Sequence, residues 1–123
     1  MNTALWIVQG ILALMFLMAG AMKLMKPKEE MAEKMAWVED FSQTQIRGIG
    51  ALEVLGALGL ILPPVTGILP WLAPVAAIGL VLTMIGAAMT HQKRGEMQMI
   101  GMNVMLLVLA AFVAYGRFVS VPF

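Results

Sequence analysis

Cysteine is absent from the 123 residues, and histidine occurs once, at His91. Without cysteine the chain can form no disulfide, no CxxC redox motif and no thiolate ligand. With one histidine, a multi-histidine metal site cannot form within a protomer, so no metal site is predicted. Charged residues are also scarce, at 12% of the chain, and the net charge is only +1. Because nucleic-acid binding needs a basic face, this balance argues against nucleic acid as a partner.

Apolar residues dominate what is present. They make up 61% of the chain, and the mean hydropathy is +0.90, whereas soluble globular domains contain about 45–50% apolar residues. A soluble domain of this length has too small an interior to bury so many apolar side chains. We therefore predict a single integral membrane domain over residues 1–123, with membrane lipid as its main contact.

Four apolar stretches are long enough, or nearly so, to cross a bilayer as helices. At 1.5 Å per residue, about 20 residues cover a hydrocarbon core of roughly 30 Å. The stretches cover about residues 3–22, 46–62, 71–90 and 97–116. They predict an all-α fold, a four-helix transmembrane bundle with up-down-up-down topology. The first stretch could instead be a signal peptide, but no basic segment precedes it, which favours a retained helix.

The two longer connections differ in character. Residues at about 27–40 begin with Pro27, and Met31, Met35 and Val38 recur at helical spacing. This pattern predicts a short amphipathic helix that lies in the membrane interface or, alternatively, caps the mouth of the bundle. The later connection is rich in proline, which is predicted to end the second helix at Pro63-Pro64 and to delay the third.

Positive charges fall on alternate connections and so predict an orientation. They lie between the first and second helices or between the third and fourth: Lys23, Lys26, Lys28, Lys34 and Arg47, then Lys93 and Arg94. Positively charged connections stay in the cytoplasm. We therefore expect a bacterial inner-membrane protein with both termini outside. Arg117, at the far end of the fourth helix, is the one charge that does not fit this rule.

Small and polar residues share a stripe on each predicted helix. Small residues let helices pack closely in lipid, and polar side chains avoid lipid, so these stripes are expected to face one another. The predicted packing positions are Gly50, Gly56, Gly79 and Gly86, the last two within the stripe Ala76, Gly79, Thr83, Gly86 and Thr90.

Most polar residues of these stripes are predicted to lie in the cytoplasmic half of the bundle. Glu53, Asn103 and Thr83 reach similar depths, and Lys23 and His91 lie at the mouth. These five are the candidate ligand-binding or proton-linked residues; none is proposed as catalytic. Gln9 and Arg117 belong to the opposite half.

Each candidate also has a structural interpretation. A charge in a membrane helix costs about 2.5–3.5 kcal/mol even on the mildest scale, so Glu53 is either a proton acceptor or ligand contact, or it stabilises the bundle. In the structural case it would pair with Lys23 or bond Asn103. Asn103 is expected to bond between helices, Lys23 to anchor its helix at the rim, and His91 to be solvated.

The chain resembles the DoxX-like proteins in three places. They are Gly20-x-x-Lys23-Leu24, then Gly50-x-x-Glu53-x-x-Gly56 followed by Leu60 and Pro63, and finally Tyr115-Gly116-Arg117-Phe118. The resemblance implies a four-helix membrane bundle. It also implies links, seen for some relatives, to quinone-coupled sulfur oxidation, to membrane redox complexes or to membrane-protein assembly.

Three functions stay open. The first is an accessory subunit or assembly factor, in contact with other membrane proteins or a second copy, that binds a small apolar molecule such as a quinone or lipid near Glu53. The second is a proton-coupled transporter resembling the small multidrug resistance family, in which the glutamate lies in the first helix instead. The third is a purely structural interaction module. No nucleophile–base pair or phosphate loop is recognised, so no independent catalytic activity is predicted.

Overall fold

The computed structural model describes residues 1–32 and 35–122, which form helices and no strands. The elements are α1 (Asn2–Met25), α2 (Lys28–Ala32), the 3-10 helix η1 (Ala36–Asp40), α3 (Gln43–Thr66), α4 (Leu72–Arg94), α5 (Met97–Tyr115) and the π-helical turn η2 (Gly116–Ser120) that continues α5. Within the described chain, four helices are long and apolar enough to cross a membrane. The predicted four-helix bundle is confirmed.

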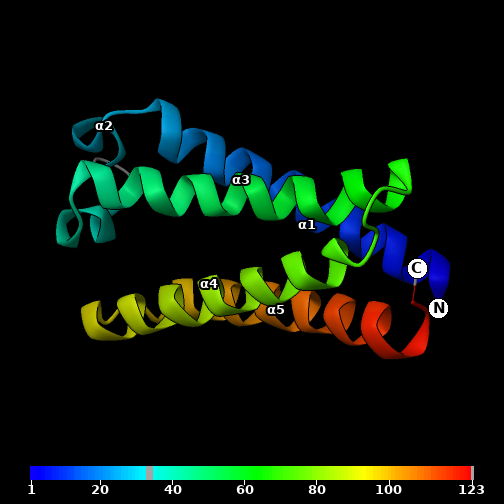
Figure 1. Cartoon of the computed structure of the whole chain (residues 1–123). Coiled ribbons are helices and arrows are strands. Elements are labelled where there is room, and N and C mark those ends of the chain that lie inside the picture. The colour runs from blue at the N-terminus through cyan, green and yellow to red at the C-terminus, as the bar shows by residue number, and fades with distance from the viewer. Residues whose placement is uncertain (33–34, 123) are drawn as a thin grey trace.

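The four long helices form two antiparallel pairs, α1 with α3 and α4 with α5 (Figure 1). The pairs meet through α3 with α4 and, less extensively, through α1 with α5. Both termini and the α3–α4 connection lie at one end of the bundle, which we call the terminal end. The connection containing α2 and η1 and the α4–α5 turn lie at the other end, which we call the charged end (Figure 1).

The predicted stripes on α1 and α3 face the interior. All of the α1 stripe is buried: Gln9, Ala13, Phe16, Gly20 and Lys23. A Cβ added at Gly50 would lie 2.7 Å from the carbonyl oxygen of Gly20, and one added at Gly56 would lie 2.7 Å from the Leu80 side chain. Because real Cβ atoms do not approach a backbone oxygen so closely, position 50 needs glycine, whereas at Gly56 a side chain would require the Leu80 side chain to shift. At both positions the glycine lets the neighbouring helix come close.

The packing prediction is wrong for Gly79 and Gly86 on α4. Both are exposed, and a Cβ added at either would meet no atom within 4 Å. The larger side chains of Leu80 and Met84 fill the core from this helix instead, and Leu80 reaches Gly56 on α3. Helix α4 is therefore turned so that Gly79 and Gly86 border open space, while Ala76 at one end of the stripe lies against α3 near Gly59.

The two prolines do not end α3, which continues to Thr66. A proline inside a helix removes the N–H that would bond the carbonyl four residues earlier. For Pro64 that carbonyl belongs to Leu60, and it accepts a hydrogen bond of 2.8 Å from Gln9 Nε2 on α1. The helix ends one turn later at Gly67, whose φ of 74° suits glycine and whose N–H bonds the Pro63 carbonyl.

Gln9 also connects α3 to the end of the chain. Its Oε1 accepts a 2.7 Å hydrogen bond from Arg117 Nε, and Arg117 Nη1 donates to Asn2 Oδ1 at 2.8 Å. The guanidinium lies 5.4 Å from the ring centre of Trp6. Arg117, the charge that did not fit the orientation rule, is thus buried in a polar cluster. This cluster joins α1, α3 and η2 and fills the terminal end of the bundle.

If Gln9 compensates for Pro64, the two positions should be energetically coupled. Gln9→Leu leaves the Leu60 carbonyl without its donor and should lower the free energy of unfolding by about 1–3 kcal/mol. Pro64→Ala restores a backbone N–H to that carbonyl, so the double variant should recover about 1 kcal/mol relative to additive effects. Reversible unfolding in mixed detergent micelles measures each variant.

Pro63→Ala is the matched control, because it supplies an N–H to the carbonyl of Gly59 rather than to that of Leu60. It should not rescue Gln9→Leu. Equal rescue by the two alanines would mean that the prolines act only through general helix stability.

Candidate functional site

The connection between α1 and α3 covers the charged end of the bundle. It is helical, as predicted, but in two pieces, α2 and η1, separated at Met35 rather than continuous over 27–40. Glu33 and Lys34 of the predicted helix lie outside the described residues. The apolar side chains of this connection are buried in a small core of their own: Met31, Trp37 and Val38, with Ile46 of α3. The connection is therefore a cap over the bundle mouth, the second of the two alternatives, and we call residues 26–32 and 35–42 the cap.

Beneath the cap lies a cavity of about 510 Å³ between the four long helices. Its walls are mainly apolar, and Met35, Trp37 and Phe41 of the cap close it at the charged end. All five candidates predicted from the sequence line this cavity: Lys23, Glu53, Thr83, His91 and Asn103. These residues come from four different helices. The fold therefore brings together side chains that are up to 80 positions apart in the sequence, as Lys23 and Asn103 are.

Lys23 and Glu53 form a buried ion pair inside the cavity wall. Lys23 Nζ donates to Glu53 Oε1 at 2.7 Å, and the two residues are only 8% and 3% exposed. The ammonium also lies 5.7 Å from the ring centre of Trp37 in the cap. Lys23 therefore turns into the bundle instead of extending to the rim as expected. The ammonium and the carboxylate place two opposite charges at the cavity, and together they add no net charge.

Asn103 does not bond Glu53. Its Nδ2 donates to Met84 Sδ at 3.7 Å, and its Oδ1 is buried without a hydrogen-bond partner among the residues that the structure describes. A thioether sulfur is a weak acceptor. The expected role of Asn103 as a bond between helices is thus reduced to one weak contact, and its buried oxygen is left unsatisfied in a residue that lines the cavity.

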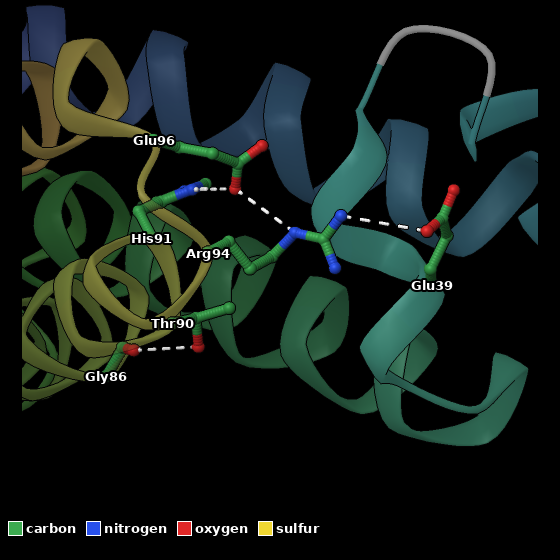
Figure 2. Close-up of polar contacts among 6 residues, drawn as sticks. All are labelled: Glu39, Gly86, Thr90, His91, Arg94 and Glu96. Carbon is green, nitrogen blue, oxygen red and sulfur yellow. Dashed lines mark hydrogen bonds and ion pairs between the residues drawn. The ribbon is translucent and has the colours of Figure 1, made fainter.

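His91 is buried at 4% exposure, so the prediction that it is solvated is wrong. Gly95, at φ 72°, turns the chain back so that the Glu96 N–H bonds the His91 carbonyl at 2.9 Å. The Glu96 carboxylate then lies 3.0 Å from His91 Nδ1 (Figure 2). An ionised carboxylate can only accept, so this contact favours the tautomer that carries its proton on Nδ1.

Arg94 connects the α4–α5 turn to the cap. It lies between two carboxylates, with Nη2 3.6 Å from Glu39 of η1 and Nε 3.5 Å from Glu96 (Figure 2). Trp37 of the same 3-10 helix packs edge-on against His91, with ring centres 6.2 Å apart. These contacts fix the cap to α4 over the cavity.

Two threonines on α4 add hydroxyl groups to the cavity wall. Thr83 Oγ1 donates to the Gly79 carbonyl at 2.9 Å, and Thr90 Oγ1 donates to the Gly86 carbonyl at 3.1 Å (Figure 2 for Thr90). Since each proton is used within the helix, the hydroxyl oxygens can serve a ligand only as acceptors.

The arrangement is suited to binding. The cavity combines apolar walls with a few fixed polar groups, as ligand sites do. No group of three or more His, Cys, Asp or Glu residues in the described part of the chain could hold a metal ion. Sequence analysis missed the contribution of Trp37, Glu39, Arg94 and Glu96, because their positions depend on how two connections fold against each other.

The family is now established by comparison. The model of the DoxX-like family matches residues 7–113, which include all four long helices in large part. The chain therefore belongs to the DoxX-like family. No curated protein and no solved structure matches it.

The ion pair should make Glu53 costly to remove alone. Glu53→Leu leaves the Lys23 ammonium buried without its carboxylate and should destabilise the bundle by about 3–5 kcal/mol. Lys23→Met combined with Glu53→Leu should recover most of this loss, because no charge is then buried. Glu30→Leu, at the exposed Lys26–Glu30 pair of 3.9 Å, is the control and should cost under about 1 kcal/mol. A double variant as unstable as Glu53→Leu would mean that the site needs the charges themselves.

Proposed function

We propose that this member of the DoxX-like family binds a small apolar molecule in the cavity beside Glu53, as an accessory subunit of a membrane complex. The observation that supports this most directly is the cavity of about 510 Å³, lined by the Lys23–Glu53 pair and by Asn103, whose buried amide oxygen has no partner among the described residues. Its volume lies within the range of roughly 300–1,000 Å³ that is usual for small-molecule sites.

The charges of the cavity favour an uncharged ligand. Lys23 and Glu53 neutralise each other at 2.7 Å, so a charged molecule would meet no unbalanced counter-charge from this pair. The rest of the wall is mostly methionine, leucine and aromatic side chains, which contact apolar groups well. A quinone or another neutral lipid of the membrane fits these requirements.

The accessory role follows from the chemistry of the side chains. The chain has no cysteine and one histidine, so electrons for a bound quinone would have to come from a partner protein or another cofactor. The alternative of a proton-coupled transporter gains less support, because the carboxylate that would carry the proton is already paired with Lys23.

Filling the cavity should remove the bound molecule. Gly86 lines the cavity and has room for a side chain, so Gly86→Leu should place an isobutyl group in the site without disturbing helix packing. Native mass spectrometry of the detergent-purified protein should show a bound small molecule on the unsubstituted protein and about tenfold less on the variant, equivalent to about 1.4 kcal/mol.

Gly101→Leu is the matched control, since Gly101 is also an exposed helical glycine with no atom near its Cβ position and does not line the cavity. It should retain the molecule. A folded protein that carries no ligand, or a Gly86→Leu variant that keeps it, would favour the purely structural module.

We further propose that the protein lies in a bacterial inner membrane with both termini outside. The bundle puts the termini and the uncharged α3–α4 connection at the same end (Figure 1), and Lys26, Lys28, Lys93 and Arg94 belong to the opposite end. Positively charged connections are retained in the cytoplasm. The cap and the His91–Glu96 turn would then face the cytoplasm.

Single cysteines can test this orientation because the chain has none of its own. Glu29→Cys in the cap and Ile68→Cys in the α3–α4 connection replace exposed side chains. In intact spheroplasts, a membrane-impermeant maleimide should label the cysteine at 68 and spare the one at 29. Labelling of position 29 alone would invert the orientation, and labelling of both would contradict the four-span arrangement.

A further inference from the structure

We infer that the bound molecule is an amphipathic lipid, with a hydrogen-bond-donating head beside Asn103 and an apolar tail that leaves the cavity between α3 and α4. The inference rests on the proposed function and specifies its ligand. Two independent features carry it, the unpartnered amide oxygen and a groove that continues the cavity toward lipid.

The head must donate a hydrogen bond because of how Asn103 is held. Met84 sulfur can accept but cannot donate, so the amide presents Nδ2 to the sulfur and its oxygen elsewhere. That oxygen has no partner in the described part of the chain, although Asn103 is only 7% exposed and lines the cavity. Burial of an unsatisfied acceptor is unfavourable, so a ligand that supplies an O–H or N–H is preferred. A hydroquinone meets this requirement, whereas the oxidised quinone does not.

The tail has a path because a second hollow adjoins the cavity. It has a volume of about 530 Å³ and lies between α3 and α4, where Leu55, Gly56, Ala76, Gly79 and Leu80 contribute to its walls. Leu52, Leu82 and Thr83 line both hollows, so the two adjoin at these side chains. Leu52 and Leu82 are 61% and 63% exposed on the apolar outer surface. The groove therefore opens sideways, where lipid surrounds the bundle.

The glycines of α4 keep this path open. Gly86 borders the cavity and Gly79 borders the groove, and a Cβ added at either would meet no atom within 4 Å. From Thr83 to Ala76 the groove follows α4 for about 10 Å at 1.5 Å per residue. A molecule confined to the cavity would not need this length, whereas the chain of a lipid would.

For a lipid, entry between α3 and α4 is more direct than entry through the charged end, because the cap covers that end. At the charged end, Trp37 packs on His91 and Arg94 pairs with Glu39 across the mouth of the cavity. A lipid that diffuses in the bilayer can enter between α3 and α4 without crossing this polar layer.

Three probes test the inference with the full-length protein: 1-hexadecanol, its methyl ether, and 1-octanol. Each is added at the same mole fraction to detergent micelles, and binding is measured by native mass spectrometry. The alcohol donates a hydrogen bond and the ether does not, so the protein should bind hexadecanol about tenfold more than the ether, a preference of about 1.4 kcal/mol. Asn103→Leu should bring this ratio close to one.

The tail path is tested separately by chain length. Gly79→Leu should weaken hexadecanol binding about tenfold and leave octanol binding unchanged, because only the long chain reaches the groove. Gly10→Leu on α1, another exposed helical glycine with free space, should change neither. Equal binding of alcohol and ether would overturn the donor head, and equal effects of Gly79→Leu on both alcohols would overturn the tail path. Absence of binding for all three probes, with no effect of Gly86→Leu on any co-purified molecule, would overturn the proposed function itself.

Discussion

Lipid offers no hydrogen-bond partner, so most polar groups inside this bundle are satisfied by another part of the same protein. Much of the structure follows from this constraint. At the terminal end, Pro64 cannot bond the Leu60 carbonyl, and the Gln9 amide from α1 does so instead. At the charged end, the Glu53 carboxylate meets Lys23 across the same pair of helices. Two polar side chains on α1, Gln9 and Lys23, thus hold α1 to α3, one toward each end of the bundle. Gly20 on α1 and Gly50 on α3 allow the two helices to come close.

The other half of the bundle is less tightly constrained. The α3–α4 contact depends on Leu80 against Gly56 and on Ala76 near Gly59, whereas Gly79 and Gly86 of α4 do not contribute to it. Where small residues on one helix are not met by a neighbour, the backbone stays apart and space remains. The cavity and the groove are this space. Glycine therefore has two effects in this bundle. On α3 it allows close helix packing, and on α4 it maintains an opening, because α4 is rotated so that Gly79 and Gly86 do not face a neighbouring helix.

Much of the fold could be predicted from the sequence because hydropathy and helix length are local properties. The four spans, the buried stripe on α1 and the convergence of Lys23, Glu53, Thr83, His91 and Asn103 all follow from spacing of 3.6 residues per turn and from the depth of each residue. The rotation of α4 was not predictable in this way. Its stripe of small residues and its face of Leu80 and Met84 are both credible packing surfaces, and only the contact with Gly56 decides between them.

The burial of His91 and the pairing of Arg117 were missed for another reason. Both depend on groups that come close only after turns have formed: Glu96 after the left-handed residue Gly95, and Gln9 at the opposite end of the chain. The local signal that could have indicated the burial of His91 is Gly95 followed by Glu96, an acid five residues after the histidine. No local signal in the sequence indicates the pairing of Arg117 with Gln9.

The Lys23–Glu53 pair links the stability of the bundle to the chemistry of its cavity. Removing one partner strands a charge, so the pair is maintained for folding whatever its other role. Once present, it places a strong dipole in an apolar cavity without adding net charge. Trp37 lies against Lys23 and against His91, so the same aromatic ring contacts the ion pair on one side and the cap's attachment to α4 on the other. A molecule that displaces Trp37 from the cavity wall would disturb both contacts together.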